Sequence, residues 1–269
     1  MHIYRLTFTL LSDATFGRGE GIAGLIDREV EHDRFGLPYL RGRTLKGLVS
    51  EEADNLLFVL ERLGRLTPEW TAARQGLFGR PGSATDDRGR LRFGHAELPA
   101  AVREAVLTIP DAGTDSNRLL VLESLTAIRR QTAIESDEKH YGVPAEGSLR
   151  SMRVILRQTP FEARLLSEVG LEKTPFDLAL LAAAMMAFRR AGTGRNRGRG
   201  KLFADLLDAQ GQSLLASGYE FFSSHALGLG HPQAVSYTHL RAHETVLDLV
   251  CRLLLAKQKN IRQYRTDRS

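Results

Sequence analysis

A glycine-rich, basic decapeptide at positions 192–201 restricts the possible folds of this chain more than any other segment. It reads Gly-Thr-Gly-Arg-Asn-Arg-Gly-Arg-Gly-Lys, and six Lys or Arg residues, with no carboxylate among them, fall within 189–201. Glycines permit positive φ angles and let a ligand approach the backbone closely. Exposed amides beside guanidinium groups suit phosphates, so the segment predicts a loop that holds a polynucleotide backbone. A solvated basic turn is the alternative interpretation.

The decapeptide differs from both common glycine motifs for small nucleotides. A P-loop would need Gly in place of Arg195 and Ser or Thr in place of Leu202. A dinucleotide fingerprint would need Gly in place of Arg197 and would run from a strand into a helix. Here an apolar helical segment at 178–190 precedes the decapeptide and a strand-like segment at 202–207 follows it. These differences favour a polynucleotide over a mononucleotide or dinucleotide.

The last part of the chain, residues 235–269, looks foreign to the rest. It carries seven Lys or Arg and three Asp or Glu, so it supplies +4 of the formal net charge of +5. The run Val-Ser-Tyr-Thr-His-Leu-Arg-Ala-His-Glu-Thr at 235–245 resembles a translated sequencing adapter. We therefore expect a non-native tail and leave it out of the functional reasoning. A genuine amphipathic helix at 245–257 is the alternative.

The remaining composition is that of a soluble globular protein. Apolar residues make up 42% of the chain and charged residues 26%. No run of about 18 apolar residues occurs, which predicts that the protein has no membrane span. The start of the chain lacks a secretory apolar region, and the single Cys251 cannot form an internal disulfide. Both features predict a cytoplasmic protein.

Apolar periodicity predicts the regular elements. Residues 3–11 alternate between apolar and polar side chains, which is typical of a half-buried strand. Apolar residues at 45–63 repeat every three or four positions and predict a helix, with Thr44 as the expected N-cap. Shorter segments predict strands at 91–93, 152–157, 161–165, 202–207 and 213–215, and helices at 99–107 and 176–188.

The order of these elements predicts an α+β fold. A strand, a helix, further strands, a second helix and terminal strands are most simply arranged as a ferredoxin-like (RRM-like) sandwich. No internal repeat or low-complexity linker divides the chain. We therefore expect a single domain over residues 1–220, with insertions at 12–40, 65–118 and 126–150.

Basic side chains surround the start of the long helix. Arg41, Arg43 and Lys46 cluster there, where the free amides and the helix dipole favour an anion. Ordinary capping with solvated cations is the alternative.

Two further charged segments are candidates for function. Carboxylates crowd at 27–33, which indicates a loop or ribbon that displays them. The polar segment 126–150 predicts an extended hairpin that stands away from the core and carries Arg129 and Arg130. Surface solvation is the alternative role for these two arginines.

Four segments in order resemble one family. Gly-Leu-Pro-Tyr-Leu-Arg-Gly-Arg-Thr-Leu-Lys-Gly at 36–47 is similar to the family pattern Gly-x-Pro-Tyr-x-x-Gly-Ser-Ser-Leu-Lys-Gly. Leu-Ile-Asp at 25–27, followed by Asp33, resembles a loop that carries a target-cleaving aspartate. Segment 124–150 resembles a thumb hairpin and the strand after it, and 192–200 resembles the family's glycine-rich loop. The chain is thus identified as resembling the RAMP superfamily, specifically a backbone subunit of a type III CRISPR effector complex.

The resemblance implies a ferredoxin-like core that polymerises along a CRISPR guide RNA. The implied partners are the guide RNA, the single-stranded target RNA and other effector subunits, including copies of this chain, with no membrane. Arg41 and Arg43 depart from the family, which more often has a proline and a small hydroxyl residue there. The residues implied to bind RNA are Arg43, Thr44, Lys46, Arg129, Arg130, Gly192, Gly194, Arg195, Asn196, Arg197, Gly198, Arg199 and Gly200.

The resemblance also implies cleavage of the target RNA. Thumbs of neighbouring subunits displace one nucleotide, and the adjacent 2′-OH attacks the phosphate in line, so that RNA is cut and DNA is spared. Asp27 is the expected catalytic residue, as a general base or through a divalent metal ion, most simply Mg²⁺. A turn or salt-bridge role is the alternative for Asp27. The neighbouring Glu29, Glu31, His32 and Asp33 are expected to be solvated rather than metal ligands.

Two other functions remain open. The chain could be a structural subunit that holds guide RNA without cutting, or a guide-processing endoribonuclease of the same superfamily. Such processing enzymes usually use a histidine or general-base cluster near the N-terminus, where His2 and His32 are available. The RNA-binding hypothesis requires one groove that joins the glycine-rich loop to the Lys46 helix start, with Asp27 beside it.

Overall fold

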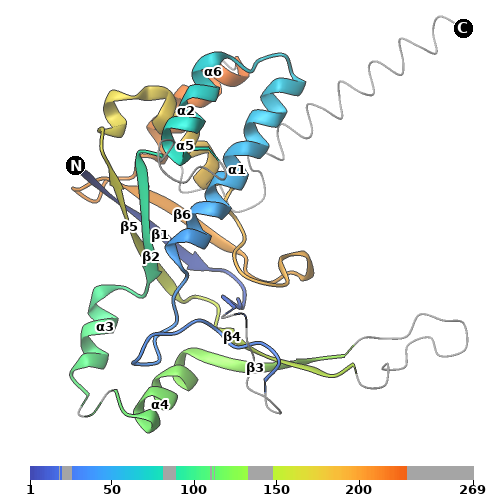
Figure 1. Cartoon of the computed structure of the whole chain (residues 1–269), viewed down its shortest axis with the longest axis vertical. Helices are drawn as coiled ribbons and strands as arrows, with labels where there is room; N and C mark the ends of the chain where they lie inside the picture. Colours follow the sequence, from blue (N-terminus) through green and yellow to red (C-terminus); the bar gives the residue numbers. More distant parts are fainter. Residues whose placement is uncertain are drawn as a thin grey trace, which may run out of the picture.

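A four-stranded antiparallel sheet lies at the centre of the computed structural model (Figure 1). The strands are β1 (His2–Leu10), β2 (Leu91–Glu97), β5 (Pro160–Ser167) and β6 (Leu202–Leu207), in the order β2-β5-β1-β6. The structure describes residues 1–17, 19, 26–80, 89–109, 111, 113–132 and 148–228. The predicted tail at 235–269 lies outside these residues.

The central strand β1 confirms the predicted alternation. Its side chains at Tyr4, Leu6, Phe8 and Leu10 are all buried, whereas the intervening residues are partly or fully exposed. Phe8 stacks on Phe161 of β5, with ring centroids 5.1 Å apart. One face of the sheet therefore forms the core.

Four helices gather at one side of this sheet (Figure 1). They are α1 (Gly42–Arg62), α2 (Pro68–Phe78), α5 (Pro175–Ala187) and α6 (Leu215–Leu227). Helix α5 is buried along most of its length, as its Ala and Met content requires, and packs against α1, α2, α6 and β6. The mixed helix and antiparallel-sheet class agrees with the predicted α+β fold.

The start of α1 differs from the prediction. The N-cap position is Arg41 rather than Thr44, and Thr44 lies inside the first turn. The helix begins earlier because the Gly42 N–H donates a hydrogen bond of 2.9 Å to Nδ1 of His95, a residue of β2. A Cβ at Gly42 would lie 2.4 Å from the carbonyl oxygen of Phe93, so only glycine allows this approach.

Three helices were missed by sequence periodicity: α2, α6 and α4 (Asp115–Leu125). Helix α2 buries Trp70, whose ring contacts Phe176 and Phe222. The predicted strand at 213–215 is a single bridge between Ser213 and Leu207, after which α6 begins. Gly218 lets α6 approach α5 closely, because a Cβ there would lie 2.5 Å from Cβ of Ala182.

A second, two-stranded antiparallel sheet stands apart from the first (Figure 1). It pairs β3 (Thr126–Gln131) with β4 (Arg150–Ile155), and we call it the β3–β4 ribbon. The short helices α3 (Ala100–Leu107) and α4 (Asp115–Leu125) precede it, and single helical turns occur at η1 (Leu171–Lys173) and η2 (Arg195–Arg197). The middle of the predicted hairpin, at 133–147, lies outside the described residues.

Candidate nucleic-acid interface

The glycine-rich loop leads from α5 into β6 and is closed at its base by backbone pairing. The N–H of Ala191 donates to the carbonyl of Gly200 over 2.9 Å, and Arg190 bridges to Lys201. Gly200 has φ +67° and a Cβ there would lie 1.9 Å from the carbonyl oxygen of Ala191. Gly192 has φ +88° and would meet the carbonyl oxygen of Thr15 at 2.5 Å. These two positions require glycine for both conformation and space.

The segment that follows β1, residues 11–17, fixes this loop in place. The Thr193 N–H donates to the Thr15 carbonyl and the Gly200 N–H donates to the Asp13 carbonyl, both over 2.9 Å. The Ser12 hydroxyl donates to the Gly198 carbonyl over 3.1 Å. These hydrogen bonds fix the base of the loop, while Asn196, Arg197 and Gly198 in its middle are exposed.

Asp27 lies on the β3–β4 ribbon, where it is exposed. Its N–H donates to the Ser151 carbonyl over 2.9 Å, and its Oδ2 accepts the Ser151 N–H over 2.7 Å. Its Oδ1 lies 3.9 Å from Nη1 of Arg150. The next residue, Arg28, bridges in parallel to Met152. The segment that carries Asp27 therefore runs along the edge of β4.

Asp27 and the glycine-rich loop line the same cavity. This cavity has a volume of about 730 Å³ and opens between the ribbon and the loop. Its charged lining is mostly cationic, and Arg199 also contacts the sulfur of Met152. The lining residues include Asp27, Arg28, Gln131, Arg150, Ser151, Met152, Thr193, Gly194, Arg197 and Arg199.

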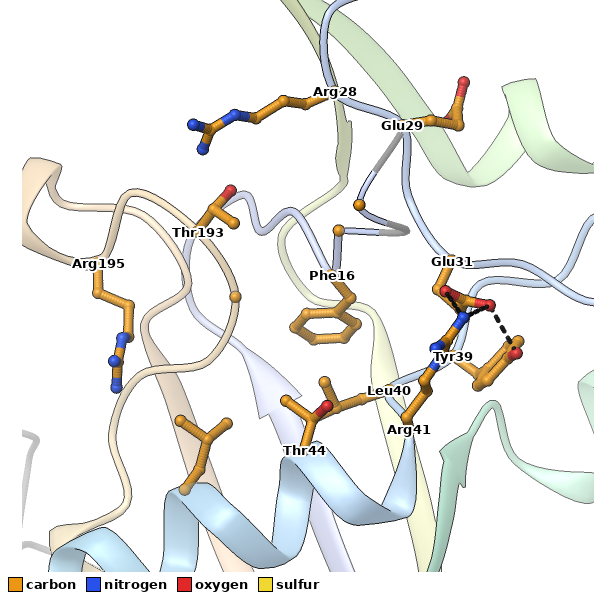
Figure 2. A pocket seen from close by; sticks show the side chains of 14 residues that line it. Phe16, Arg28, Glu29, Glu31, Tyr39, Leu40, Arg41, Thr44, Thr193 and Arg195 are labelled. Atoms are coloured by element: carbon orange, nitrogen blue, oxygen red, sulfur yellow. Dashed lines mark hydrogen bonds and ion pairs between the residues drawn. The ribbon is translucent and has the colours of Figure 1, made fainter. Parts of the chain in front are cut away.

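A second cavity of about 520 Å³ adjoins the first and shares Arg28 and Thr193 with it. Figure 2 shows Phe16 near its centre, with Thr193 and Arg195 on one side and Arg41 on the other. Thr44, on the first turn of α1, lines the same cavity. The helix start and the glycine-rich loop therefore do face one another.

A third hollow of about 830 Å³ lies between α1 and the glycine-rich loop. Glu51 and Glu52 of α1 face Arg195, Asn196 and Arg197 of the loop across it. Nη1 of Arg195 lies 3.4 Å from Oε2 of Glu51. Burial, the main cause, raises the pKa of Glu52. This hollow thus combines carboxylates with loop cations.

Lys46 lies elsewhere. It is two residues beyond Thr44, which places it about 200° around the helix axis, and it lines none of the three hollows described above. Burial, with a smaller contribution from the Arg74 cation, lowers the pKa of Lys46. Arg74 is itself held by Asp54, with Nε and Oδ1 2.6 Å apart. Arg43 is exposed beside this face and not among the lining residues.

The acidic neighbours of Asp27 are not solvated, contrary to the prediction. Glu29 is 5% exposed and its Oε1 lies 2.9 Å from Nε of Arg153. Glu31 is 7% exposed, and its carboxylate accepts hydrogen bonds from Arg41 and from the Tyr39 hydroxyl (Figure 2). These carboxylates are buried because each neutralises an arginine, so they support the loop that carries Asp27.

The remaining predicted residues occupy separate places. Arg129 of β3 pairs with Asp13, and Nη2 and Oδ2 are 3.0 Å apart, while Arg130 is exposed. His2 begins β1 and lies at the end opposite Leu10, roughly 27 Å from the glycine-rich loop at the rise of a strand. The ring of His32 contacts the Asp33 carbonyl. Sequence reasoning missed Asp13, although its position directly after a strand was visible.

The described residues contain no group of three or more His, Cys, Asp or Glu that could hold a metal ion. Within the same part of the chain, no helix combines the length and apolar character that crossing a bilayer requires.

Solved structures similar to this chain come from type III-B Cmr-beta complexes. The chain is similar to a subunit in a cryo-EM structure of the type III-B Cmr-beta complex bound to cognate target RNA, with a TM-score of 0.53 and 14% identity over 77% of this chain and 97% of that one. It is also similar to a chain of the type III-B Cmr-beta complex in its apo state, with a TM-score of 0.49 and 13% identity over 77% and 98% of the two chains. The first likeness concerns the fold alone.

A curated relative matches only in part. The DNA mismatch repair protein MutL of Syntrophotalea carbinolica (strain DSM 2380 / NBRC 103641 / GraBd1) is 34% identical over 116 residues, which is 41% of this chain and 16% of MutL. The chain therefore spans a small fraction of that protein's length. The family model described as the RAMP superfamily matches residues 7–202, a span that begins within β1, contains β2, β5, the ribbon and the glycine-rich loop, and ends at the first residue of β6. This chain belongs to the RAMP superfamily.

Proposed function

We propose that this protein is a guide-RNA-binding backbone subunit of a type III CRISPR effector complex and that it cleaves target RNA. The observation that carries the proposal is the pair of adjoining cavities that share Arg28 and Thr193. They bring Asp27, the glycine-rich loop and the start of α1 to one continuous surface. In sequence these three parts are far apart, so their meeting is a property of the fold.

The topology supports a ferredoxin-like core. Helix α1 connects β1 to β2 and helix α5 connects β5 to β6, while the sheet order is β2-β5-β1-β6. Two β-α-β units with interleaved strands make up such a core. We further propose that the β3–β4 ribbon is the base of a thumb hairpin that reaches a neighbouring copy of the chain.

Arginines of the loop and ribbon would hold the sugar-phosphate backbone. Arg28, Arg197 and Arg199 line the cavity beside Asp27, and Thr193 adds a hydroxyl. One guanidinium group can bind two phosphate oxygens at once. Such binding to the sugar-phosphate backbone is independent of the RNA sequence and sensitive to salt. A subunit that polymerises along a guide of any sequence needs this kind of contact.

The proposed reaction is attack of a ribose 2′-OH on the adjacent phosphate. The O2′–P bond forms as the P–O5′ bond breaks, the proton of the 2′-OH passes to a base, and the leaving 5′-oxygen takes up a proton from water. The products are a 2′,3′-cyclic phosphate and a 5′-hydroxyl. Asp27 is exposed and lies in the cationic cavity, so it would accept that proton or hold a divalent ion. Arginines around it would stabilise the charge that develops on the phosphate.

One carboxylate suits Mg²⁺ only in part. Mg²⁺ commonly uses one or two carboxylates together with substrate phosphates and water. Asp27 Oδ2 already accepts the Ser151 N–H, so Asp27 would hold the ion mainly through Oδ1. Bound there, the ion would supply positive charge at the reacting phosphate.

A non-catalytic structural subunit is the second candidate. It is favoured by the two hydrogen bonds between Asp27 and Ser151, which give this aspartate a structural role at the ribbon. A guide-processing enzyme receives less support, because His2 lies at the far end of β1. In either RNA-binding role we propose that the protein acts in the cytoplasm with other effector subunits.

The test is the Asp27→Asn variant in the reconstituted complex. Asparagine keeps an oxygen for the Ser151 N–H but removes the charge. We expect guide RNA to be retained and single-turnover cleavage of a labelled target to fall by about 10²-fold or more. The Glu168→Gln variant is the matched control, because Glu168 is an exposed carboxylate, paired with Arg92, outside these cavities. Cleavage at the parent rate by Asp27→Asn would establish the structural role instead.

A further inference from the structure

Asp13 joins three parts of the chain that are distant in sequence. Its Oδ2 accepts hydrogen bonds from Nε and Nη2 of Arg129 on β3, over 3.1 and 3.0 Å. Its Oδ1 accepts the N–H of Arg157, which follows β4, over 3.2 Å. Its own carbonyl accepts the Gly200 N–H over 2.9 Å. A single residue thus contacts β3 of the ribbon, the segment that follows β4, and the glycine-rich loop.

The neighbours of Asp13 extend the same connection. Ala14 pairs with Ile155 of β4 in both directions, over 3.0 and 2.7 Å. The Thr15 hydroxyl donates to the Arg153 carbonyl over 2.9 Å, and the Thr15 carbonyl accepts the Thr193 N–H. Segment 11–17 therefore lies between the ribbon and the loop and is bonded to both.

The ribbon needs such a connection because it is not part of the central sheet. Asp27 is attached to the ribbon through Ser151, whereas Arg197 and Arg199 belong to the loop. The distance between the Asp27 carboxylate and these guanidinium groups is therefore set by the angle between ribbon and loop. Among the contacts that fix this angle, Asp13 supplies an ion pair, and its side chain is 24% exposed, while Arg199 of the loop contacts the sulfur of Met152 on β4.

We infer that Asp13 is a positioning residue that sets the spacing between Asp27 and the glycine-rich loop. The inference deepens the proposed function and rests on it for its consequence in cleavage. The carboxylate holds Arg129, and with it the ribbon, at a fixed angle to the loop. Loss of the Asp13 charge leaves the backbone contacts of segment 11–17 in place, so the fold is retained. The angle between the ribbon and the loop then varies over a wider range.

The first experiment measures this angle without RNA. Nitroxide labels are placed at Arg130→Cys and Asn196→Cys in the full chain, with Cys251→Ser to remove the chain's own thiol. Arg130 and Asn196 are both exposed, one on the ribbon and one on the loop. Double electron–electron resonance should give one narrow distance distribution in the parent and a distribution at least twice as wide in Asp13→Asn. An unchanged distance distribution overturns the inference, and this outcome does not depend on whether the protein cleaves RNA.

The second experiment is a double-mutant cycle on the same labels. If Asp13 acts through Arg129, the Asp13→Asn and Arg129→Gln variants should broaden the distribution equally, and the double variant should broaden it no further. Additive broadening overturns the assignment of Arg129 as the partner. The Glu168→Gln variant removes an exposed paired carboxylate elsewhere and should leave the distribution as in the parent.

The third experiment is cleavage in the reconstituted complex. A misplacement of about 1 Å can cost up to about 10²-fold in rate, so Asp13→Asn should slow single-turnover cleavage by about 10-fold or more while guide retention stays within about twofold. Parent-rate cleavage by Asp13→Asn, together with loss in Asp27→Asn, overturns the positioning role and leaves the proposed function standing. Cleavage at the parent rate by Asp27→Asn overturns the nuclease function. The distances between the nitroxide labels then remain as the test of whether Asp13 fixes the angle between ribbon and loop.

Discussion

Replacing Gly200 with alanine tests whether backbone contacts at its base fix the conformation of the glycine-rich loop. Two effects should lower the free energy of unfolding. The backbone has φ +67°, a conformation that costs a residue with a Cβ about 1–2 kcal/mol. In addition, the new Cβ would lie 1.9 Å from the Ala191 carbonyl oxygen, and backbone atoms cannot give way as a flexible side chain would. Relief of such overpacking typically costs about 1–3 kcal/mol.

Gly198 provides the matched control in the same loop. Its φ of +78° carries the same conformational cost, but a Cβ there would meet nothing within 4 Å. Alanine also lowers the entropy of the unfolded chain, which offsets about 0.4–1 kcal/mol at both positions. We therefore expect Gly198→Ala to lower the free energy of unfolding by about 1 kcal/mol and Gly200→Ala by about 2–4 kcal/mol.

The measurement is urea unfolding of the full chain followed by circular dichroism. Equal free-energy changes in the two variants would refute the reasoning, because the Ala191 carbonyl would crowd a Cβ at Gly200 and nothing would crowd one at Gly198. The same pair of variants should separate in RNA affinity. Gly200→Ala displaces the base of the loop, whereas Gly198→Ala changes an exposed residue at which the new Cβ would meet nothing within 4 Å.

Three further predictions concern charge. Glu51→Gln should raise the affinity for single-stranded RNA severalfold in filter binding, because Arg195 would no longer be held by a carboxylate 3.4 Å away. In the isolated chain, log K against log salt should have a slope near about −2, since Arg28, Arg197 and Arg199 line the Asp27 cavity and single strands give about −0.7 per phosphate contact. Glu52→Gln should stabilise the protein at pH 7 and lose this effect below the ordinary pKa of 4.5, because burial raises the folded-state pKa and thus penalises only the charged form. Thermal melts at pH 3.5 and 7 check this sign.

Elements with strong local patterns could be predicted from the sequence. Strand β1 and helix α5 appear within one or two residues of their expected bounds, because burial on one face imposes period 2 and dense packing selects Ala and Met. Helix α2 was missed because its burial depends on Trp70 reaching Phe176 and Phe222, partners far along the chain. The start of α1 was placed late because its cap is His95, which sequence proximity does not reveal.

The candidate site could be predicted in composition but not in geometry. Asp27, Thr44 and the glycine-rich loop were each recognisable, and the fold does place them around adjoining cavities. Lys46 was grouped with them by sequence proximity to Thr44, yet two residues along a helix lie on nearly opposite faces. Glu31 was expected in solvent, because its partners Tyr39 and Arg41 become neighbours only when the loop folds.

Ion pairs between segments that are distant in the sequence neutralise several surface arginines. Arg41, Arg129 and Arg195 pair with Glu31, Asp13 and Glu51, and each pair joins segments that are separate in the sequence. In each pair the carboxylate competes with a phosphate for the guanidinium group, which is the basis of the Glu51→Gln prediction. Net charge is therefore a poor guide to the function of this protein, because residues 235–269 carry +4 of the net +5, whereas Arg28, Arg197 and Arg199 lie around the cavity where the strand is proposed to run.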